Sequence, residues 1–414
     1  MGRVARVARP PLLHTHRLST SLDHSYQASI KCSTLAGMTV IVKASGPADI
    51  LAMVPSMVRF VPQNSVVFLA FRGKRTCGAM RFDLPAAATK TVQKRIITTM
   101  VGMLCKLPSV DAVIPVIYTD KGFAGSTEIP HADFAELLGR RIKLSGFELR
   151  QSICSAADGW ASYFESTVPA GGHPLDEVVD SSAAELIPND LRELPTRDAI
   201  PRRVPDAAPE AMTRMRKRLA TYRRLIQSVT EGSGDALPTA LDPLGDLPLF
   251  AEDALGWNAA AIEANGALMA FMLQGPRARD LVMLQWATSI AVGDQMWEQG
   301  PSIESLVPST ERPENIDIGE LMMGIAPRPD PVRIDKGIAL LVALVAKLAD
   351  EERPPLLCML AWLTWALGGG TRAGRYLNEA VAINPDYSMA ELLTTMLGNG
   401  ALPEWAFLRV ARER

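Results

Sequence analysis

The chain has 414 residues, of which 48% are hydrophobic and 21% are charged, and its formal net charge is −2. This balance is typical of a folded globular protein and excludes disorder as the overall state. The near-zero net charge excludes a general electrostatic attraction to nucleic acid or to an anionic membrane surface. The length exceeds that of a single hydrophobic core, so we predict two domains.

Cysteine usage and the apolar runs indicate a cytoplasmic protein without a membrane span. The cysteines are odd in number, far apart and free of any Cys-x-x-Cys spacing, which fits a reducing compartment better than a disulfide framework. They are Cys32, Cys77, Cys105, Cys154 and Cys358. The apolar runs 337–346 and 356–367 are shorter than the roughly 18 to 20 residues that a membrane-spanning helix needs.

Residues 1–37 differ in composition from the rest of the chain. They contain one acid, Asp23, and the basic residues Arg3, Arg6, Arg9, Arg17 and Lys31. Such an arginine-rich, acid-poor leader superficially resembles an organellar transit peptide. Because Met38 directly precedes a clean strand pattern, we favour translation from an upstream start, with a disordered basic arm as the alternative. Both interpretations place residues 1–37 outside the fold, so their removal should barely change the melting temperature.

From Met38 onward the chain alternates predicted strands and helices. Strands are expected at 39–44, 65–71, 77–83, 111–118 and 147–155, and helices at 48–60, 85–106 and 133–143. The second and third strands form a hairpin around a polar turn. This order predicts an α/β fold, namely a mixed-sheet α/β sandwich over residues 38–165.

The remainder of the chain is predicted to be a linker followed by an all-helical C-terminal domain. Prolines recur through residues 166–209 and cannot lie inside regular helices or central strands, so this segment reads as a linker or a lid over the first domain. Residues 210–414 form the helical domain. Its helices are expected at 210–229, 251–273 and 277–297, followed by a second Pro-rich loop at 301–331 and a C-terminal bundle.

The clearest local pattern is a helical hairpin at 357–385. Leu360 and Ala361 lie on its first helix, residues 368–370 are all glycine, and Pro385 ends the second helix. The small residues on both helices resemble one tetratricopeptide unit, in which two antiparallel helices approach closely. Since such repeats bury their faces against neighbouring repeats, a single unit favours one hairpin of a bundle over a peptide-binding array.

Motifs of known chemistry are absent from the sequence, which predicts no cofactor. Residues 73–76 (Gly-Lys-Arg-Thr) hint at a phosphate loop, but the required earlier glycine would fall at Phe68, and the segment joins two strands. There is no Gly-x-Ser-x-Gly elbow, His-Glu-x-x-His pair or dinucleotide fingerprint. His131 and His173 lack the spacing of metal ligands to each other, and we interpret both as surface or loop residues.

Asp83 and Asp120 are the candidate catalytic or metal-binding residues. Each follows the end of a predicted strand, where ligands bind in open α/β sheets. Two carboxylates there could hold a divalent cation or act as acid and base, provided that the two strands run parallel. The alternative is local, because Asp83 could cap the helix that Pro85 opens, and Asp120 could begin a turn with Lys121 and Gly122.

A basic helix at 212–226 is the candidate nucleic-acid site. Its cations are Arg214, Arg216, Lys217, Arg218, Arg223 and Arg224. They could contact phosphates, but the apolar residues of this helix follow a three-four spacing, which equally predicts a solvated outer face above a packed stripe.

Several segments carry a resemblance to a known family. They are 60–67 (Phe-Val-Pro-Gln-Asn-Ser-Val-Val), 81–85 (Arg-Phe-Asp-Leu-Pro), 118–120 (Tyr-Thr-Asp), 160–163 (Trp-Ala-Ser-Tyr), 360–362 (Leu-Ala-Trp) and 384–387 (Asn-Pro-Asp-Tyr). From Met38 onward the chain resembles the actinobacterial domain-of-unknown-function family 4192. The resemblance implies a cytoplasmic protein and supplies no activity. Paired cysteines that members often carry after the Ser-Tyr element are replaced here by 165–169, so a metal or redox role of those cysteines does not apply.

These observations favour an interaction or regulatory module with a protein partner. The first alternative is a small-molecule or nucleotide-processing enzyme that uses Asp83 and Asp120. Nucleic-acid binding through the helix 212–226 ranks last, because no basic excess or stacking aromatics accompany it elsewhere in the chain. The sequence leaves the oligomeric state open.

Overall fold

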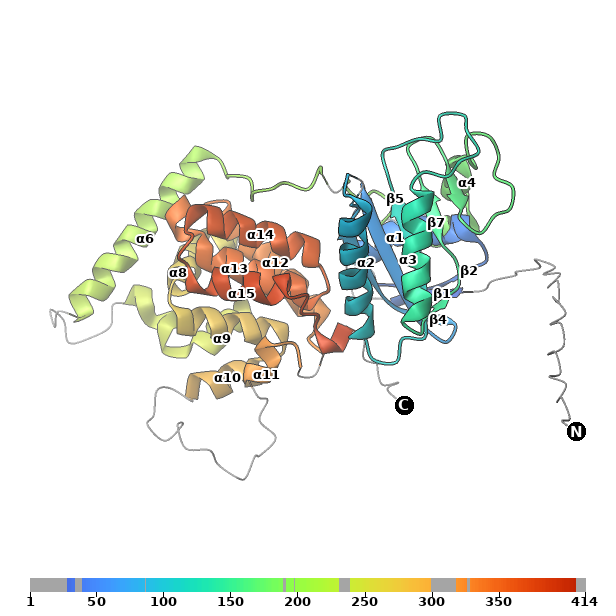
Figure 1. The fold of residues 1–414 in the computed structure, drawn as a ribbon. Coiled ribbons are helices and arrows are strands. Elements are labelled where there is room, and N and C mark those ends of the chain that lie inside the picture. Colours follow the sequence, from blue (N-terminus) through green and yellow to red (C-terminus); the bar gives the residue numbers. More distant parts are fainter. Residues whose placement is uncertain are drawn as a thin grey trace, which may run out of the picture.

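A computed structural model of the chain describes residues 28–33, 39–85, 87–188, 191–196, 198–230, 239–298, 318–325 and 328–406. These residues form an α/β domain and a helical domain that lie side by side (Figure 1). The predicted fold class is therefore confirmed. No helix in these ranges is long and apolar enough to span a membrane.

One mixed sheet forms the centre of the α/β domain. Its strands are β1 (Ala28–Ser33), β2 (Thr39–Ala44), β3 (Ser65–Arg72), β4 (Arg75–Asp83), β5 (Ala112–Tyr118), β6 (Glu148–Leu149), β7 (Ile153–Ser155) and β8 (Trp160–Ser162). The strand order is β2-β1-β4-β3-β5-β7-β8, and β6 also pairs with β5. Every residue of β5 is buried, as expected for a continuous apolar run covered on both faces.

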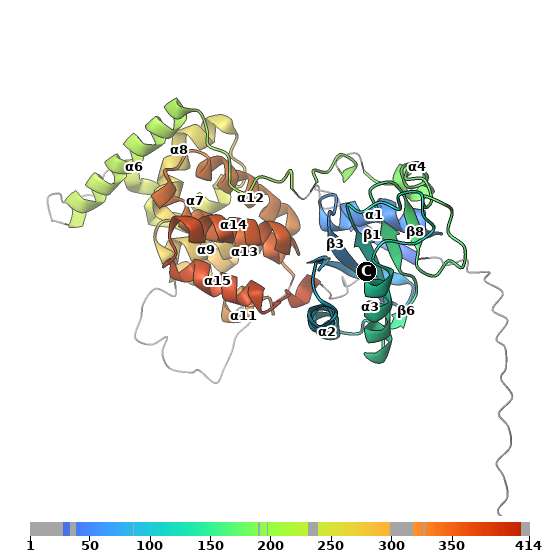
Figure 2. The ribbon, with the colours of Figure 1, turned by 45° about the horizontal axis from the view of Figure 1, so that its top comes forward.

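Helices cover both faces of this sheet. Helix α1 (Pro47–Val58) lies on one face, and α2 (Lys90–Cys105) and α3 (Ala132–Leu144) lie on the other (Figure 2). Successive side chains of β3 alternate between the two cores, because neighbouring residues of a strand point to opposite faces. Leu69 packs in the core beneath α1, whereas Phe68 and Ala70 pack in the core beneath α2 and α3.

The strand predicted at 147–155 is two short strands, β6 and β7. Strand β6 pairs with Ala112 and Val113 of β5, and β7 pairs with Val116, Ile117 and Tyr118. The interruption faces Pro115, which has no N–H group to donate to a neighbouring strand. The prediction of one continuous strand at 147–155 is therefore wrong, because Pro115 on β5 interrupts the pairing.

Strand β1 lies inside the leader that we expected to be outside the fold. It pairs antiparallel with β2 along all six residues, and Ser29 pairs in parallel with Arg75 at the start of β4. The expectation for residues 1–37 is therefore wrong for 28–33. The other leader residues lie outside the described ranges.

The position of β1 predicts an effect of truncation. A chain beginning at Met38 should melt several degrees below one beginning at Ala28, because only the shorter chain lacks the strand between β2 and β4. Thermal unfolding followed by circular dichroism compares the two chains. Equal melting temperatures would show that β1 contributes nothing to the stability of the sheet.

The Pro-rich segment after β8 packs on the α/β domain. Its short helices α4 (Asp176–Val179) and α5 (Ser182–Glu185) lie against α1. The carboxylate of Asp49 on α1 accepts hydrogen bonds from Ala183 N at 3.1 Å and from Ser182 Oγ at 3.2 Å. Further along, Thr196 forms a bridge with Val61. Part of the predicted linker therefore covers one face of the first domain.

A buried ion network fastens the end of this segment to the helical domain. The guanidinium of Arg353, which is fully buried, bonds the carboxylates of Asp206 and Glu379 and the carbonyl oxygen of Val204. The Glu379 carboxylate also accepts a hydrogen bond from Val204 N at 2.9 Å. Arg203 pairs with Asp350 at 2.5 Å on the more exposed side. Paired opposite charges thus hold residues 203–206, where the linker ends, against the helical domain.

The helical domain is built around α13. Its elements are α6 (Pro209–Thr230), η2 (Thr239–Asp246), α7 (Leu247–Ala254), α8 (Ala259–Met272), α9 (Pro276–Ala287), α10 (Ile290–Glu298), α11 (Ile318–Met322), α12 (Pro331–Val345), η4 (Asp350–Glu352), α13 (Pro354–Ala366), α14 (Gly370–Ile383), α15 (Ser388–Gly398) and η5 (Glu404–Ala406). Every residue of α13 is buried, which a helix that is apolar on all sides requires.

Two of the predicted long helices are each two helices. The helix predicted at 251–273 ends at Ala254 and restarts at Ala259, where Asn258 Oδ1 accepts a hydrogen bond from Ala261 N at 3.0 Å. The helix predicted at 277–297 breaks at Thr288, whose φ of −125° and ψ of −91° are not helical. In the first case the N-cap Asn258 begins a new helix, although the apolar pattern of the sequence continues without a break.

The C-terminal hairpin is confirmed as a pair of packed helices, α13 and α14. Gly368 adopts a φ of +83° in the turn between them, a conformation that glycine reaches without strain. Ala361 and Ala373 are buried, as expected for residues at a close helix approach. Its resemblance to a tetratricopeptide unit stays a prediction.

The segment after α15 returns to the α/β domain. Asn399 O accepts a hydrogen bond from Lys106 Nζ at 3.3 Å, and Leu402 packs against the core beneath α2. Gly400 adopts a φ of +68°, a backbone conformation that glycine reaches without strain, where the chain passes Met103 on α2. The two domains are therefore joined by a second crossing besides the linker.

Candidate functional site

The structure places Asp83 and Asp120 at the same edge of the sheet. Strands β4 and β5 both pair antiparallel with β3, so they run parallel to each other. Asp83 ends β4, and Asp120 follows two residues after the end of β5. The condition that the sequence set for a shared site, parallel strands, is therefore met.

Asp83 is held by a neighbouring arginine and does not cap a helix. Its carboxylate lies 2.5 Å from the guanidinium of Arg81, which also donates to Ser65 Oγ at 2.8 Å. Helix α2 begins at Lys90 and is capped by Thr89 instead, so the expected capping role and the start at Pro85 are both wrong. Asp83 is 68% exposed, and its carboxylate therefore remains largely hydrated.

Asp120 forms a reciprocal pair with Asn64. The side-chain amide of Asn64 donates to the Asp120 carboxylate, and Asp120 N donates back to Asn64 Oδ1 at 3.2 Å. Asn64 has a φ of 42°, in the left-handed region that asparagine tolerates better than most residues. The turn before β3 thus presents its amide directly to the end of β5.

The two carboxylates lie at the ends of different strands and bind different partners. Strand β3 separates them, and since adjacent strands lie about 4.8 Å apart, β4 and β5 are roughly 10 Å apart. These separate partners disfavour a cation shared between the two carboxylates. Within the described ranges no three His, Cys, Asp or Glu side chains come together in a group that could hold a metal ion.

We therefore expect no magnesium effect from this edge. Millimolar Mg²⁺ should leave the melting temperature of the full chain unchanged, because a ligand shifts it only by binding the folded state. The variants Asp83→Asn and Asp120→Asn are compared with the parent chain, and the melting temperature of each is measured with and without Mg²⁺. A shift that disappears in both variants would restore the enzymatic hypothesis.

A hydroxyl–imidazole pair at this edge was missed by the sequence reasoning. His131, which we interpreted as a surface or loop residue, precedes α3 with a φ of 61°, and its Nε2 lies 3.0 Å from Thr119 Oγ1. Burial and, secondarily, the positive charge of Lys121 lower the pKa of His131, which favours the neutral form of the ring. Because Lys121 N donates to the Thr119 oxygen at 3.2 Å, the hydroxyl proton is available to the imidazole. No spacing in the sequence signals this contact.

The basic helix, α6, packs on the bundle by its apolar stripe. Met215 and Leu219 are buried. Several of its cations also bond the bundle: Arg214 pairs with Glu263 at 2.8 Å, Arg218 donates to the carbonyl oxygen of Ala264 at 3.1 Å, and Arg223 pairs with Glu352 at 2.6 Å. These arginines hold the helix in place.

Among the described residues, the other three cations of α6 make no hydrogen bond or ion pair with the bundle. Arg216, Lys217 and Arg224 are exposed, and at 3.6 residues per turn they share a face with Ala220. Within the part of the chain that the structure describes, Arg224 bonds only its own helix, at Ala220 O and Thr221 Oγ1, both at 3.3 Å. Figures 1 and 2 show α6 at the end of the molecule farthest from the α/β domain. We call Arg216, Lys217, Ala220 and Arg224 the outer face of α6.

Comparison with known proteins places most of the chain in one family. Searches of curated proteins and of solved structures found no match. The family described as a domain of unknown function, DUF4192, matches residues 47–298 and 330–404, which include α1, the central strands, α6 and the C-terminal hairpin. The chain therefore belongs to the DUF4192 family.

Proposed function

We propose that the protein is an interaction module and that the outer face of α6 binds an acidic surface of a protein partner. Cytoplasmic residence is part of this proposal, because the spacing of the cysteines favours a reducing compartment. The enzymatic alternative is weaker, since its two named carboxylates are separated by β3 and each has a bonding partner.

One observation carries the proposal: the division of the α6 cations into two sets. Arg214, Arg218 and Arg223 bond the bundle, which fixes the orientation of the helix. That orientation turns Arg216 and Lys217 to solvent, and no acid follows Glu210 before the end of α6 to compensate them. A rigid helix with a one-sided positive face presents its charges without a cost in ordering the backbone.

The size of the charged face indicates a transient complex. An exposed ion pair contributes only about 0.2–1 kcal/mol, so three pairs alone give weak binding. They act mainly on the rate of encounter and on the choice of partner. Because salt screens exposed charges within about 8–10 Å, binding through this face should weaken steeply as ionic strength rises.

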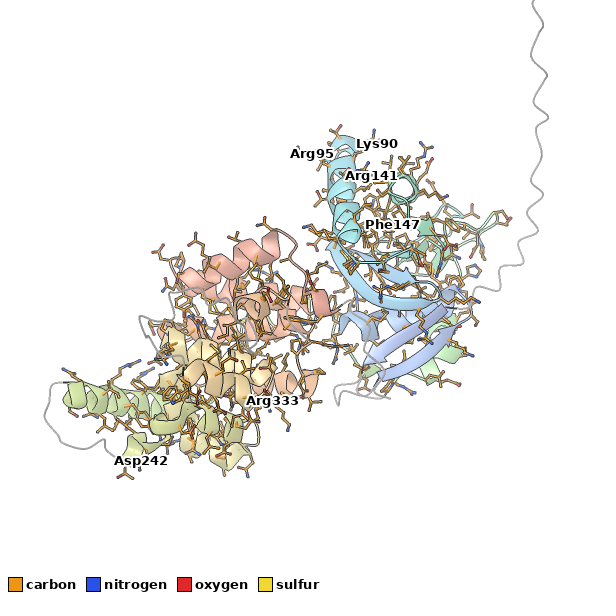
Figure 3. All side chains as sticks on the ribbon, turned by 90° about the horizontal axis from the view of Figure 1, so that it is seen from below. Lys90, Arg95, Arg141, Phe147, Asp242 and Arg333 are labelled. Carbon is orange, nitrogen blue, oxygen red and sulfur yellow. The ribbon has the colours of Figure 1, made fainter. Side chains whose placement is uncertain are left out.

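Affinity capture from the native host tests the proposal. The charge reversal Arg216→Glu/Lys217→Glu should lose a discrete protein partner that the parent chain captures, because it replaces attraction by repulsion. The matched control is Lys94→Glu/Arg95→Glu, an adjacent exposed pair on α2 in the other domain, where Figure 3 labels Arg95. Both variants should melt like the parent, since neither pair contacts the core.

The same experiment separates the alternatives. If nuclease treatment abolishes the association, the partner is nucleic acid and not a protein. A partner retained equally by both charge-reversed variants would show that α6 does not carry the binding.

A further inference from the structure

A cavity of about 320 Å³ opens at the opposite edge of the sheet from Asp83 and Asp120. It lies between the N-terminus of α1, the connection from β6 to β7, and the segment that follows β8. The start of α1 therefore meets two segments that lie about a hundred residues later in the chain. Its volume is within the range of pockets that hold small molecules.

The walls of this cavity combine an apolar surface with hydrogen-bonding groups. Its apolar lining includes Ile50 and Pro47 of α1 and Phe164, which is 42% exposed. Gln151 and Ser162 also line the cavity, and Ser162 Oγ donates a hydrogen bond of 2.6 Å to Gln151 Oε1. Among the described residues the amide nitrogen of Gln151 has no hydrogen-bond partner, so it can donate to a ligand.

The charged groups of the cavity already bind partners within the protein. Arg150 donates to the Glu148 carboxylate at 2.9 Å and to Gly73 O at 2.6 Å. Glu165 lies 2.9 Å from His173 Nε2, and the His173 ring stacks on Trp160 with a centroid distance of 4.4 Å. Arg150 and Glu165 thus each already have a bonding partner within the protein, which disfavours a strongly charged ligand.

The N-terminus of α1 does not reverse this conclusion. Gly46 at the N-cap has no side chain to cap the helix, which by itself would favour an anion. However, Asp49 lies in the first turn and accepts hydrogen bonds from Ser45 N at 2.8 Å and from Ser45 Oγ at 2.7 Å. Although burial opposes ionisation, these bonds together with those from Ala183 and Ser182 lower the pKa of Asp49. Its negative charge offsets the positive end of the helix.

We infer that this cavity binds a small neutral ligand with several hydroxyl groups, of the size of a monosaccharide. The apolar face of the sugar ring stacks on Phe164. Its hydroxyl groups bond Gln151 and the Ser166 and Thr167 hydroxyls at the exposed rim. This site is independent of the proposed role of α6, because it lies in the other domain.

Ligand-observed saturation-transfer NMR on the full chain tests this site, with D-glucose, N-acetyl-D-glucosamine and D-ribose as probes. At least one probe should give a saturable signal at millimolar concentration. Phe164→Ala should weaken that binding roughly tenfold, a loss of about 1.4 kcal/mol. Leu144→Ala, which also truncates an exposed apolar residue of the same domain, should leave the binding unchanged.

Ser166→Trp supplies a second variant, since a large side chain on the exposed rim should block the cavity without disturbing the core. The inference is overturned if no probe binds saturably, or if binding survives in both Phe164→Ala and Ser166→Trp. Displacement of the bound probe by inorganic phosphate would equally overturn it, because that result would identify an anion site.

Discussion

Arg353→Met should lower the free energy of unfolding of the helical domain by about 3–5 kcal/mol. The substitution removes the cation of a fully buried network and leaves the Glu379 carboxylate, only 4% exposed, without its closest positive partner. An unpaired buried charge costs far more than a lost surface pair. The linker residue Val204 bonds the same carboxylate, so the entry of the chain into the helical domain should loosen as well.

Urea unfolding followed by circular dichroism measures this loss, with Arg203→Met as the control. Arg203 belongs to the same network but is 43% exposed, so its removal should cost about 1 kcal/mol or less. The Arg353 guanidinium holds the pKa of Asp206 below its ordinary value of 3.8. A lowered pKa stabilises the fold above that value, so the difference between parent and variant should shrink as the pH falls below 3.8. If Arg353→Met and Arg203→Met lose equal amounts of unfolding free energy, the buried Arg353 guanidinium is not the centre of this ion network.

Trp286→Ala should destabilise the helical domain by a comparable amount, about 3–5 kcal/mol. Trp286 is fully buried on α9, and its Nε1 donates to Ala251 O on α7 at 2.7 Å. A Cβ atom on Gly337 of α12 would lie 2.9 Å from the indole ring, which shows how closely α12 packs on it. The truncation therefore opens a cavity where three helices meet and leaves one carbonyl oxygen without its donor.

The matched control for this cavity is Trp297→Ala on α10. Trp297 is 36% exposed and lies beneath the Arg277 guanidinium, 5.7 Å from ring centroid to Cζ. Its loss should cost less than half as much, because more than a third of Trp297 is already exposed to water whereas Trp286 is fully buried. Urea titrations of both variants give the comparison, and a Trp286→Ala protein as stable as the Trp297→Ala protein would refute the packing described for α9.

Local sequence patterns predicted the elements of the α/β domain well, and they failed where distant contacts decide the outcome. The run 111–118 is apolar enough to specify a buried strand, and β5 occupies nearly that range. The division of its neighbour into β6 and β7 depends on Pro115, which becomes significant only when the two strands are aligned. The inclusion of 28–33 in the sheet likewise depends on pairing with β2 and β4, for which single-strand patterns carry no signal.

The candidate sites show the same division between local and distant information. Both aspartates were found because strand ends are visible in the sequence. The partner of Asp120, Asn64, is 56 residues away, and only the pairing of β3 with β5 brings the two side chains together. On α6 the cations and the apolar stripe were both evident. Which cations face the bundle was not, since that depends on where Glu263 and Glu352 lie in the folded domain.

The most direct test of an α6-mediated interaction is site-specific photo-crosslinking in the native host. A photoreactive residue at position 217 should form a crosslink to a discrete acidic protein, and the same residue at position 94 on α2 should not. The crosslink should fade as salt is added and should survive nuclease treatment. Crosslinking of equal yield at the two positions, or products that nuclease removes, would contradict a protein-binding role for the outer face of α6.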